Sequence, residues 1–192
     1  MRVLILNGAS HGDPRIREFV ESEQASLERE GFDVTRHDLA DEGIAFCQGC
    51  FDCWVKTPGV CKTHDDANSI SAAYAASDVV LLVSPILFGG YGPELKKALD
   101  RSIGLVSPFF EKVNGETHHM KRYARYPAIL TVGFLRTTDA EQAEIFRALA
   151  ARHALNFRAP AFACEIVEPG VERPVSVVPR VNALLEAQAA AS

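Results

Sequence analysis

Four of the five cysteines lie close together, in a segment at about residues 44–63. The pattern C-x2-C-x2-C-x7-C is formed by Cys47, Cys50, Cys53 and Cys61. Compact thiolate clusters with two-residue gaps can wrap a cubane iron–sulfur cluster, because several sulfurs face one centre. Structural zinc more often uses two ligand pairs separated by a longer segment, so zinc is the less favoured metal. The remaining interpretation is a structural or dimerising flap without metal, ordered by the packing of Trp54 and the turn at 57–59.

A second chemical feature is the turn NGASHGDP at residues 7–14, which follows the first apolar segment. A turn leading from a strand into a helix offers unpaired backbone N–H groups and the positive end of a helix dipole, which suits a phosphate. Ser10 can add a hydroxyl donor and Arg15 a charge. Neither G-x-G-x-x-G nor G-x-x-x-x-G-K-S/T is present, which disfavours dinucleotide Rossmann, ATP and GTP sites. The alternative is a tight turn without a ligand.

The segment SPILFGGYGP at residues 84–93 combines apolar and aromatic side chains with glycines. An isoalloxazine ring needs such a wall, with apolar faces and backbone amides that reach its polar edge. The other interpretation is that Phe88 and Tyr91 only pack the loop. Two suitable loops, after the first and the third predicted strand, favour a flavin.

Alternating strand-like and helix-like segments must position these residues. Apolar runs predict strands at 3–6, 32–37, 79–84, 128–133 and 157–166. Helical spacing predicts helices at 14–30, 66–77, 95–106, 140–154 and 181–190. Asp13 is expected to cap the first helix. The alternation predicts an α/β fold with a parallel sheet covered on both faces, in a single domain over residues 1–192.

Composition excludes several classes of protein. The chain has 192 residues, 47% of them hydrophobic and 23% charged, with a formal net charge of −5. This acidic balance argues against nucleic acid as a partner. No apolar run is long enough for a membrane span, and the first apolar run is too short for a signal peptide. A cytoplasmic location is therefore expected, where cysteines are reduced, metal-bound or catalytic.

The turn at 7–14, the segment SPILFGGYGPELKKALDR and the cysteine cluster with CKTHDD together resemble the NAD(P)H-dependent FMN reductase superfamily. Within it, the sequence is most similar to the iron–sulfur flavoprotein branch, over about residues 1–135. The resemblance implies a flavodoxin-like three-layer α/β/α fold whose five-stranded parallel sheet has the order 2-1-3-4-5. It also implies bound FMN and assembly as a homodimer or homotetramer.

The resemblance further implies roles for individual residues. The FMN phosphate would lie at Ser10, His11, Gly12 and Arg15. The ring would lie against Pro85, Ile86, Leu87, Phe88 and Gly89, with Gly133 at the start of a third loop. Cys47, Cys50, Cys53 and Cys61 would ligate a [4Fe–4S] cluster that exchanges electrons with FMN. Two departures are the anionic Asp13 beside the phosphate and a third loop, at 133–139, that is not glycine-rich.

The predicted function is an FMN-dependent oxidoreductase that takes electrons from NAD(P)H and passes them to a quinone, a flavin, a nitro compound or an iron–sulfur acceptor. The hydride step needs no protein acid or base, so no catalytic residue is nominated. An alternative is an iron–sulfur flavoprotein that acts as an electron carrier fed by a ferredoxin-type partner. A flavin-free binding protein is the least favoured possibility.

For the remaining residues of interest, we expect positions at the surface or packing roles. His118 and His119 are adjacent and should point different ways, most simply from an exposed connector. Lys96 and the pair Asp100–Arg101 are expected on a solvated helix face. Cys164 is expected to be a small buried hydrophobe. The aromatic pair at 109–110 would cover a partner subunit or pack into the core.

Overall fold

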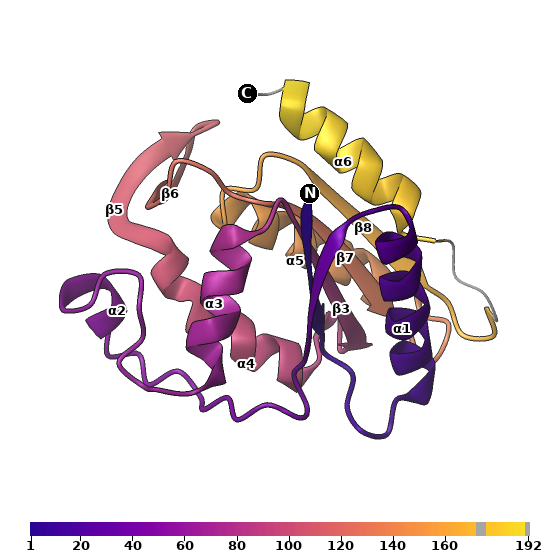
Figure 1. Cartoon of the computed structure of the whole chain (residues 1–192). Helices are drawn as coiled ribbons and strands as arrows, with labels where there is room; N and C mark the ends of the chain where they lie inside the picture. The colour runs from indigo at the N-terminus through magenta and orange to yellow at the C-terminus, as the bar shows by residue number, and fades with distance from the viewer. Residues whose placement is uncertain (172–175, 191–192) are drawn as a thin grey trace.

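A mainly parallel sheet lies between two layers of helices in the computed structural model, which describes residues 1–171 and 176–190 (Figure 1). Its parallel strands are β2 (Asp33–Asp38), β1 (Arg2–Asn7), β3 (Val79–Leu87), β7 (Ala128–Phe134) and β8 (Phe162–Val167), in that order across the sheet. Numbered along the chain, these five strands have the predicted order 2-1-3-4-5. The flavodoxin-like fold is confirmed, with one additional short strand, β4 (Gly90–Tyr91), antiparallel to β3.

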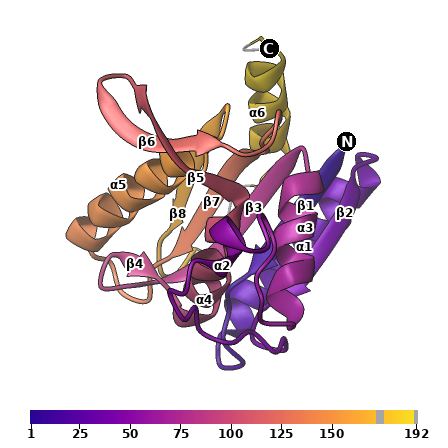
Figure 2. The same ribbon diagram turned by 90° about the vertical axis from the view of Figure 1, so that its left-hand side faces the viewer.

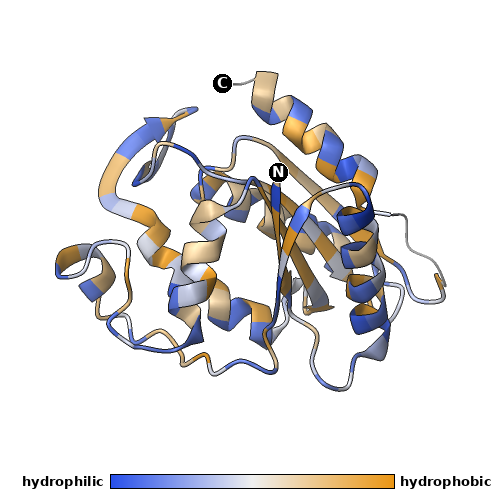
Figure 3. Cartoon of the chain, in the orientation of Figure 1, coloured by the Kyte–Doolittle hydropathy of each residue, from blue (hydrophilic) through white to orange (hydrophobic). Residues whose placement is uncertain are grey.

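Each inner strand is buried on both faces because its successive side chains alternate between the two helical layers. In β1, Val3 and Ile5 belong to one hydrophobic cluster, whereas Leu4 and Leu6 belong to the other. Figure 3 shows the distribution of hydropathy, with hydrophobic strands at the centre and hydrophilic residues on the outward faces of the helices. The apolar runs in the sequence therefore predicted the strands well.

Two helices cover one face of the sheet and three cover the other. The first layer contains α1 (Pro14–Arg29) and α6 (Val178–Ala190). The second contains α3 (Asp66–Ala76), α4 (Pro93–Arg101) and α5 (Ala140–Asn156). A single helical turn, α2 (Asp52–Val55), lies within the cysteine segment. No helix in the described ranges is long and apolar enough to cross a membrane.

Two predicted boundaries were wrong. The helix expected to reach residue 106 ends at Arg101 and continues as the 3-10 helix η1 (Ser102–Leu105). Gly104 weakens the helix there, and a Cβ on Gly104 would lie 3.3 Å from Cβ of Cys53, so the chain runs close to the cysteine segment. The last parallel strand starts at Phe162 rather than 157, because Phe157 still caps α5.

A second sheet was not predicted. It is an antiparallel hairpin of β5 (Val106–Val113) and β6 (Glu116–Lys121), which lies outside the central sheet beside α5 (Figure 2). Asn114 and Gly115 form its two-residue turn, and both have positive φ, at 51° and 85°. This is the backbone of a type I′ turn, which suits the right-handed twist of a hairpin and is typical of Asn-Gly.

Candidate flavin site and cysteine segment

The carboxyl ends of β1, β3 and β7 meet at one edge of the sheet, where open α/β sheets bind ligands. The segments after β3 and β7 enclose a cavity of about 180 Å³ at this edge. Its lining consists of Ile86, Leu87, Phe88, Leu135, Arg136, Thr137 and Gln142. The apolar part of the predicted ring wall is thus assembled in one place, with a cationic side chain at its border.

The turn between β1 and α1 is held tightly against β3 and α4. The Gly8 amide donates to the Val83 carbonyl over 2.8 Å. A Cβ on Gly8 would lie 2.8 Å from Cβ of Leu95 and 2.9 Å from the Val83 oxygen. Only glycine fits there, so Gly8 fixes the turn in place.

Asp13 does not cap α1, and that prediction was wrong. Asp13 occupies the N-cap position, but its side chain makes no capping hydrogen bond. One carboxylate oxygen accepts a 2.7 Å hydrogen bond from Ser10 Oγ, and the other lies 3.4 Å from Nη2 of Arg136. A hydroxyl and a guanidinium outside the helix therefore satisfy the carboxylate in place of the backbone amides of the first turn.

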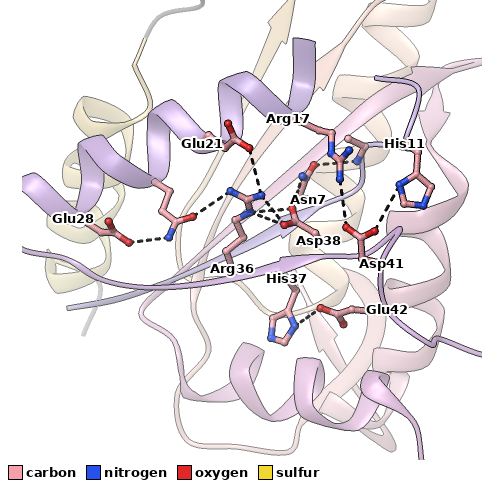
Figure 4. Close-up of polar contacts among 12 residues, drawn as sticks. Asn7, His11, Arg17, Glu21, Glu28, Arg36, His37, Asp38, Asp41 and Glu42 are labelled. Atoms are coloured by element: carbon pink, nitrogen blue, oxygen red, sulfur yellow. Dashed lines mark hydrogen bonds and ion pairs between the residues drawn. The ribbon is translucent and has the colours of Figure 1, made fainter. Parts of the chain in front are cut away.

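The other predicted phosphate ligands lie at different depths around the turn. His11 and Gly12 are exposed, and Nδ1 of His11 lies 3.6 Å from Asp41. Arg17 also pairs with Asp41, so the turn is linked to the segment after β2 (Figure 4). Arg15 instead donates to the carbonyls of residues 168 and 171, and its guanidinium lies 5.4 Å from the centre of the Phe134 ring.

The tip of the β3–β4 hairpin carries an unusual phenylalanine. Phe88 and Gly89 form a two-residue turn with φ values of 51° and 74°. A positive φ is strained for a bulky residue, and such strain is concentrated at functional sites. The Phe88 side chain is 96% exposed at the border of the cavity. The Gly89 amide donates to the side chain of Gln142 over 3.4 Å, which anchors the tip on α5.

Pro85 and Gly133 are buried behind the cavity wall. A Cβ on Gly133 would lie 2.5 Å from the Phe146 ring and 2.8 Å from Cδ1 of Ile86. Gly133 thus lets Ile86 and Phe146 close the back of the cavity. The structure gives Gly133 a packing role.

Tyr91, expected either to wall the ring or only to pack the loop, points back to α5. Its hydroxyl lies 3.0 Å from Nδ1 of His153, and its ring packs edge-on against Phe146. Burial, with a smaller contribution from the charge of Lys96, lowers the pKa of His153 to about 4. Burial also raises the pKa of Tyr91 above its usual range. A neutral Tyr–His pair therefore supports the hairpin from behind.

The four clustered cysteines line a single pocket. Cys53 is buried, Cys61 half-buried, and Cys47 and Cys50 exposed. Burial, followed by the neighbouring thiols, raises the pKa of Cys53. In the part of the chain that the structure describes, no three His, Cys, Asp or Glu side chains converge as a metal site. The thiols share a pocket, but they are not preassembled as a ligand set.

Arg101 lies at the base of the cysteine pocket, contrary to its predicted place on a solvated face. Its side chain is 1% exposed. Nη1 and Nη2 bind the Asp65 carboxylate over 2.7 and 2.9 Å, and they also donate to the carbonyls of Ala45 and Thr63. Arg101 thereby joins the two ends of the cysteine segment. Lys96, by contrast, pairs with Asp100 on the helix surface, as expected.

A row of aromatic rings joins the cysteine segment to the β5–β6 hairpin. Phe51 stacks on Trp54 with ring centres 5.2 Å apart. His119 lies 4.8 Å from Trp54 and 4.6 Å from Phe110. Trp54 Nε1 also donates to the carbonyls of residues 103 and 106. We call Phe51, Trp54, His119 and Phe110 the aromatic row.

The two adjacent histidines do point different ways, as predicted. His119 joins the aromatic row, whereas His118 is buried between Asn156 and Glu116, at 3.0 Å from each. The exposed connector expected for this region was wrong, because β6 packs one of its faces on α5. Cys164 is half-buried on β8, less completely than predicted, and burial raises its pKa to about 11.

Comparison with known proteins now identifies the family. Residues 1–166 match the family described as NADPH-dependent FMN reductase. The chain belongs to this family. The predicted resemblance to the NAD(P)H-dependent FMN reductase superfamily is confirmed.

Individual relatives agree with this assignment. An iron–sulfur flavoprotein of Methanocaldococcus jannaschii is 30% identical over 102 residues, which cover 53% of this chain and 52% of that protein. The chain spans about half the length, or less, of the curated relatives that it matches. The NAD(P)H:quinone oxidoreductase of Methanothermobacter marburgensis has a TM-score of 0.67 at 17% identity, covering 100% of this chain and 97% of that one.

A third relative is an FMN-dependent NADH-azoreductase of Bacillus anthracis, whose structure contains FMN. It has a TM-score of 0.58 at 15% identity, and the alignment covers 99% of this chain and 97% of that one. At these identities the two solved structures establish the shared fold.

Sequence reasoning missed three residues that shape the two regions, and it misplaced a fourth, Arg101. Arg136 and Gln142 border the cavity, and Arg101 and Asp65 hold the cysteine segment. Arg136 could have been found, since it follows directly after a strand that ends at the ligand-binding edge. No local signal distinguishes Arg101 from a surface residue, because its burial depends on contacts with distant segments.

Proposed function

We propose that the chain is an FMN-dependent oxidoreductase that takes electrons from NAD(P)H and passes them to a small acceptor such as a quinone or a flavin. The observation that carries this proposal is the cavity at the carboxyl edge of the sheet, with apolar walls and the β1–α1 turn at the same edge. The family match supports FMN as the cofactor.

The residues present suit FMN. The phosphate would lie at the β1–α1 turn, held by the first-turn amides of α1 and by Ser10, His11 and Gly12. Arg15 belongs to the same group through its place on α1, although its guanidinium is bound to backbone carbonyls in this structure. The ring would lie against the segment 85–89, with Gly133 behind it.

Bound FMN would supply the hydride-accepting chemistry, and the chain would orient it. Ile86 and Leu87 would pack against the ring and exclude water from one face. The exposed Phe88 would border the open face, where NAD(P)H and then the acceptor stack in turn. We assign no catalytic residue, because hydride transfer to a flavin needs no protein acid or base.

The second candidate function uses the cysteine segment. We propose that Cys47, Cys50, Cys53 and Cys61 hold a [4Fe–4S] cluster, which would make the chain an electron carrier fed by a ferredoxin-type partner. The shared pocket supports this, as does the buried positive charge of Arg101 at its base, because thiolates bound to iron are anionic. The relative from M. jannaschii carries the name iron–sulfur flavoprotein.

We further propose a homodimer or homotetramer in the cytoplasm. The exposed side chains of Phe109 and Phe110 support assembly, since a subunit interface would cover them. Light scattering of the purified protein tests it, and a monomer at high concentration would contradict it. A reducing compartment would keep the free thiols available.

One set of experiments on anaerobically purified protein tests the two functions together. It consists of an absorption spectrum, iron and sulfide analysis, and steady-state assays. Flavin bands with turnover of NADH or NADPH and a quinone are expected for the first. Iron and sulfide at four per chain, with flavin reduced by ferredoxin and by neither nucleotide, would favour the second. A colourless protein that takes up no added FMN would contradict both.

A further inference from the structure

The carboxylate of Asp13 lies within the β1–α1 turn, in contact with Ser10 and Arg136. It accepts a 2.7 Å hydrogen bond from Ser10 Oγ and lies 3.4 Å from Nη2 of Arg136. Its side chain is 17% exposed, so the carboxylate is turned into the turn rather than toward solvent. Asp13 is also the N-cap residue of α1, yet it leaves the backbone amides of the first turn without a side-chain cap.

Ser10 and Arg136 are the donors that a phosphate group would need at this place. A hydroxyl and a guanidinium both bind phosphate oxygens well, and the guanidinium contributes charge as well as hydrogen bonds. A carboxylate and a phosphate are both acceptors with negative charge. They cannot share one pair of donors without strong repulsion.

The other basic side chains near the turn already have partners. His11 and Arg17 face Asp41, at 3.6 and 3.4 Å. Arg15 donates to backbone carbonyls of the segment after β8. Arg136 is thus the cation that the structure brings to the carboxylate of Asp13.

We propose that Asp13 acts as an internal anion that competes with the flavin phosphate for Ser10 and Arg136. Arg136 then becomes a phosphate ligand when Asp13 is displaced. Because the phosphate must displace a carboxylate, the turn favours FMN over riboflavin only weakly, and the flavin is exchangeable. This inference rests on the proposed function, which places the FMN phosphate at this turn.

The test compares Asp13→Asn with the wild-type chain by titrating each flavin-free protein with FMN and with riboflavin, following the quenching of flavin fluorescence. Removing one negative charge next to a phosphate is expected to tighten FMN binding about tenfold. The affinity for riboflavin, which has no phosphate, should change less than twofold. Asp33→Asn, at the opposite end of the sheet, is the matched control and should change neither affinity.

Asp13→Ser serves as a second variant, because serine is a good N-cap residue and keeps the start of α1 intact. Arg136→Gln gives the reciprocal measurement. It should weaken FMN binding several-fold more in the Asp13→Asn background than alone, because Asp13 no longer holds the guanidinium. Riboflavin binding should show no such coupling.

The outcomes separate this inference from the proposed function. If the wild-type chain binds FMN and neither Asp13 variant binds it more tightly, the inference is wrong and the flavin site stands. An equal gain for FMN and riboflavin would also overturn it, because the effect would then not involve the phosphate. If no variant binds either flavin, both the inference and the proposed flavin site are wrong.

Discussion

The flavin side of the molecule and the cysteine side are held in place by different means. On the flavin side, the turn after β1 and the β3–β4 hairpin follow directly from neighbouring strands of one sheet. On the cysteine side, residues 44–63 contain only one helical turn and are held by Arg101, by Asp65 and by the aromatic row. Strand register therefore positions one region, and side chains from distant segments position the other.

This difference affects how each region should respond to change. Backbone hydrogen bonds of a buried sheet are shared among many residues, so a flavin-side variant must disturb packing to have an effect. By contrast, a segment held by one buried ion pair depends on two side chains, so changing either of them should have a large effect. Four predictions use this contrast.

The largest effect is expected from Arg101→Gln. It would leave the Asp65 carboxylate partly buried without its cation and remove the contacts to Ala45 and Thr63, at a cost of about 3–5 kcal/mol in the free energy of unfolding. Urea denaturation measures it. Lys96→Gln, which removes only a surface pair on the same helix, should cost less than about 0.5 kcal/mol. Equal losses from the two variants would show that Arg101 does not hold the cysteine segment.

The next effect is expected from Gly133→Ala on the flavin side. The new methyl group would overlap the Phe146 ring and Ile86, which should cost about 1–3 kcal/mol of stability. FMN binding should weaken several-fold, because Ile86 must move into the cavity. Gly43→Ala, outside the proposed flavin site, is the control, since its Cβ would meet nothing closer than Oδ2 of Asp66 at 3.5 Å. A stable Gly133→Ala protein with unchanged FMN affinity would show that the cavity wall is not rigidly packed.

The flavin side should also be sensitive to acid through His153. Its pKa is about 4 in the folded chain and about 6.5 when unfolded, so below pH 6.5 the unfolded chain binds the proton first. Stability should therefore fall as the pH falls from 6.5 toward 4, by about 2 kcal/mol between pH 6.5 and 5. His153→Gln should lack this part of the pH dependence in urea titrations at pH 7 and pH 5. If the stabilities of the two proteins fell equally between pH 7 and pH 5, His153 would not be the group responsible.

The smallest effect is expected from His119→Ala in the aromatic row. Loss of ring contacts with Trp54 and Phe110 should cost about 1 kcal/mol. Because Trp54 is the sole tryptophan, its emission should shift to longer wavelength as water reaches the ring. His64→Ala, an exposed histidine in the same region, is the control. An unchanged spectrum in His119→Ala would show that the hairpin does not order the cysteine segment.

Much of the fold could be predicted from the sequence, because the relevant signals are local. Fully apolar runs separated by helical spacing indicated the parallel sheet and its two helical layers. The β5–β6 hairpin also had a local signal, Asn114-Gly115 between alternating residues, which was not interpreted as a turn. Its recognition would have placed His118 and His119 on opposite faces of a strand.

What the sequence determined by itself was the alternation of strands and helices, the places of the two loops after the first and third strands, and the grouping of the cysteines. These depend on periodicity and spacing along the chain. Only the tertiary structure decided that Arg101 is buried beneath the cysteines, that Tyr91 faces His153, and that Asp13 turns to Ser10 and Arg136. Each of these contacts joins segments distant in the sequence or chooses among several available partners. Burial and competition between partners, which arise when the chain is packed, determine them.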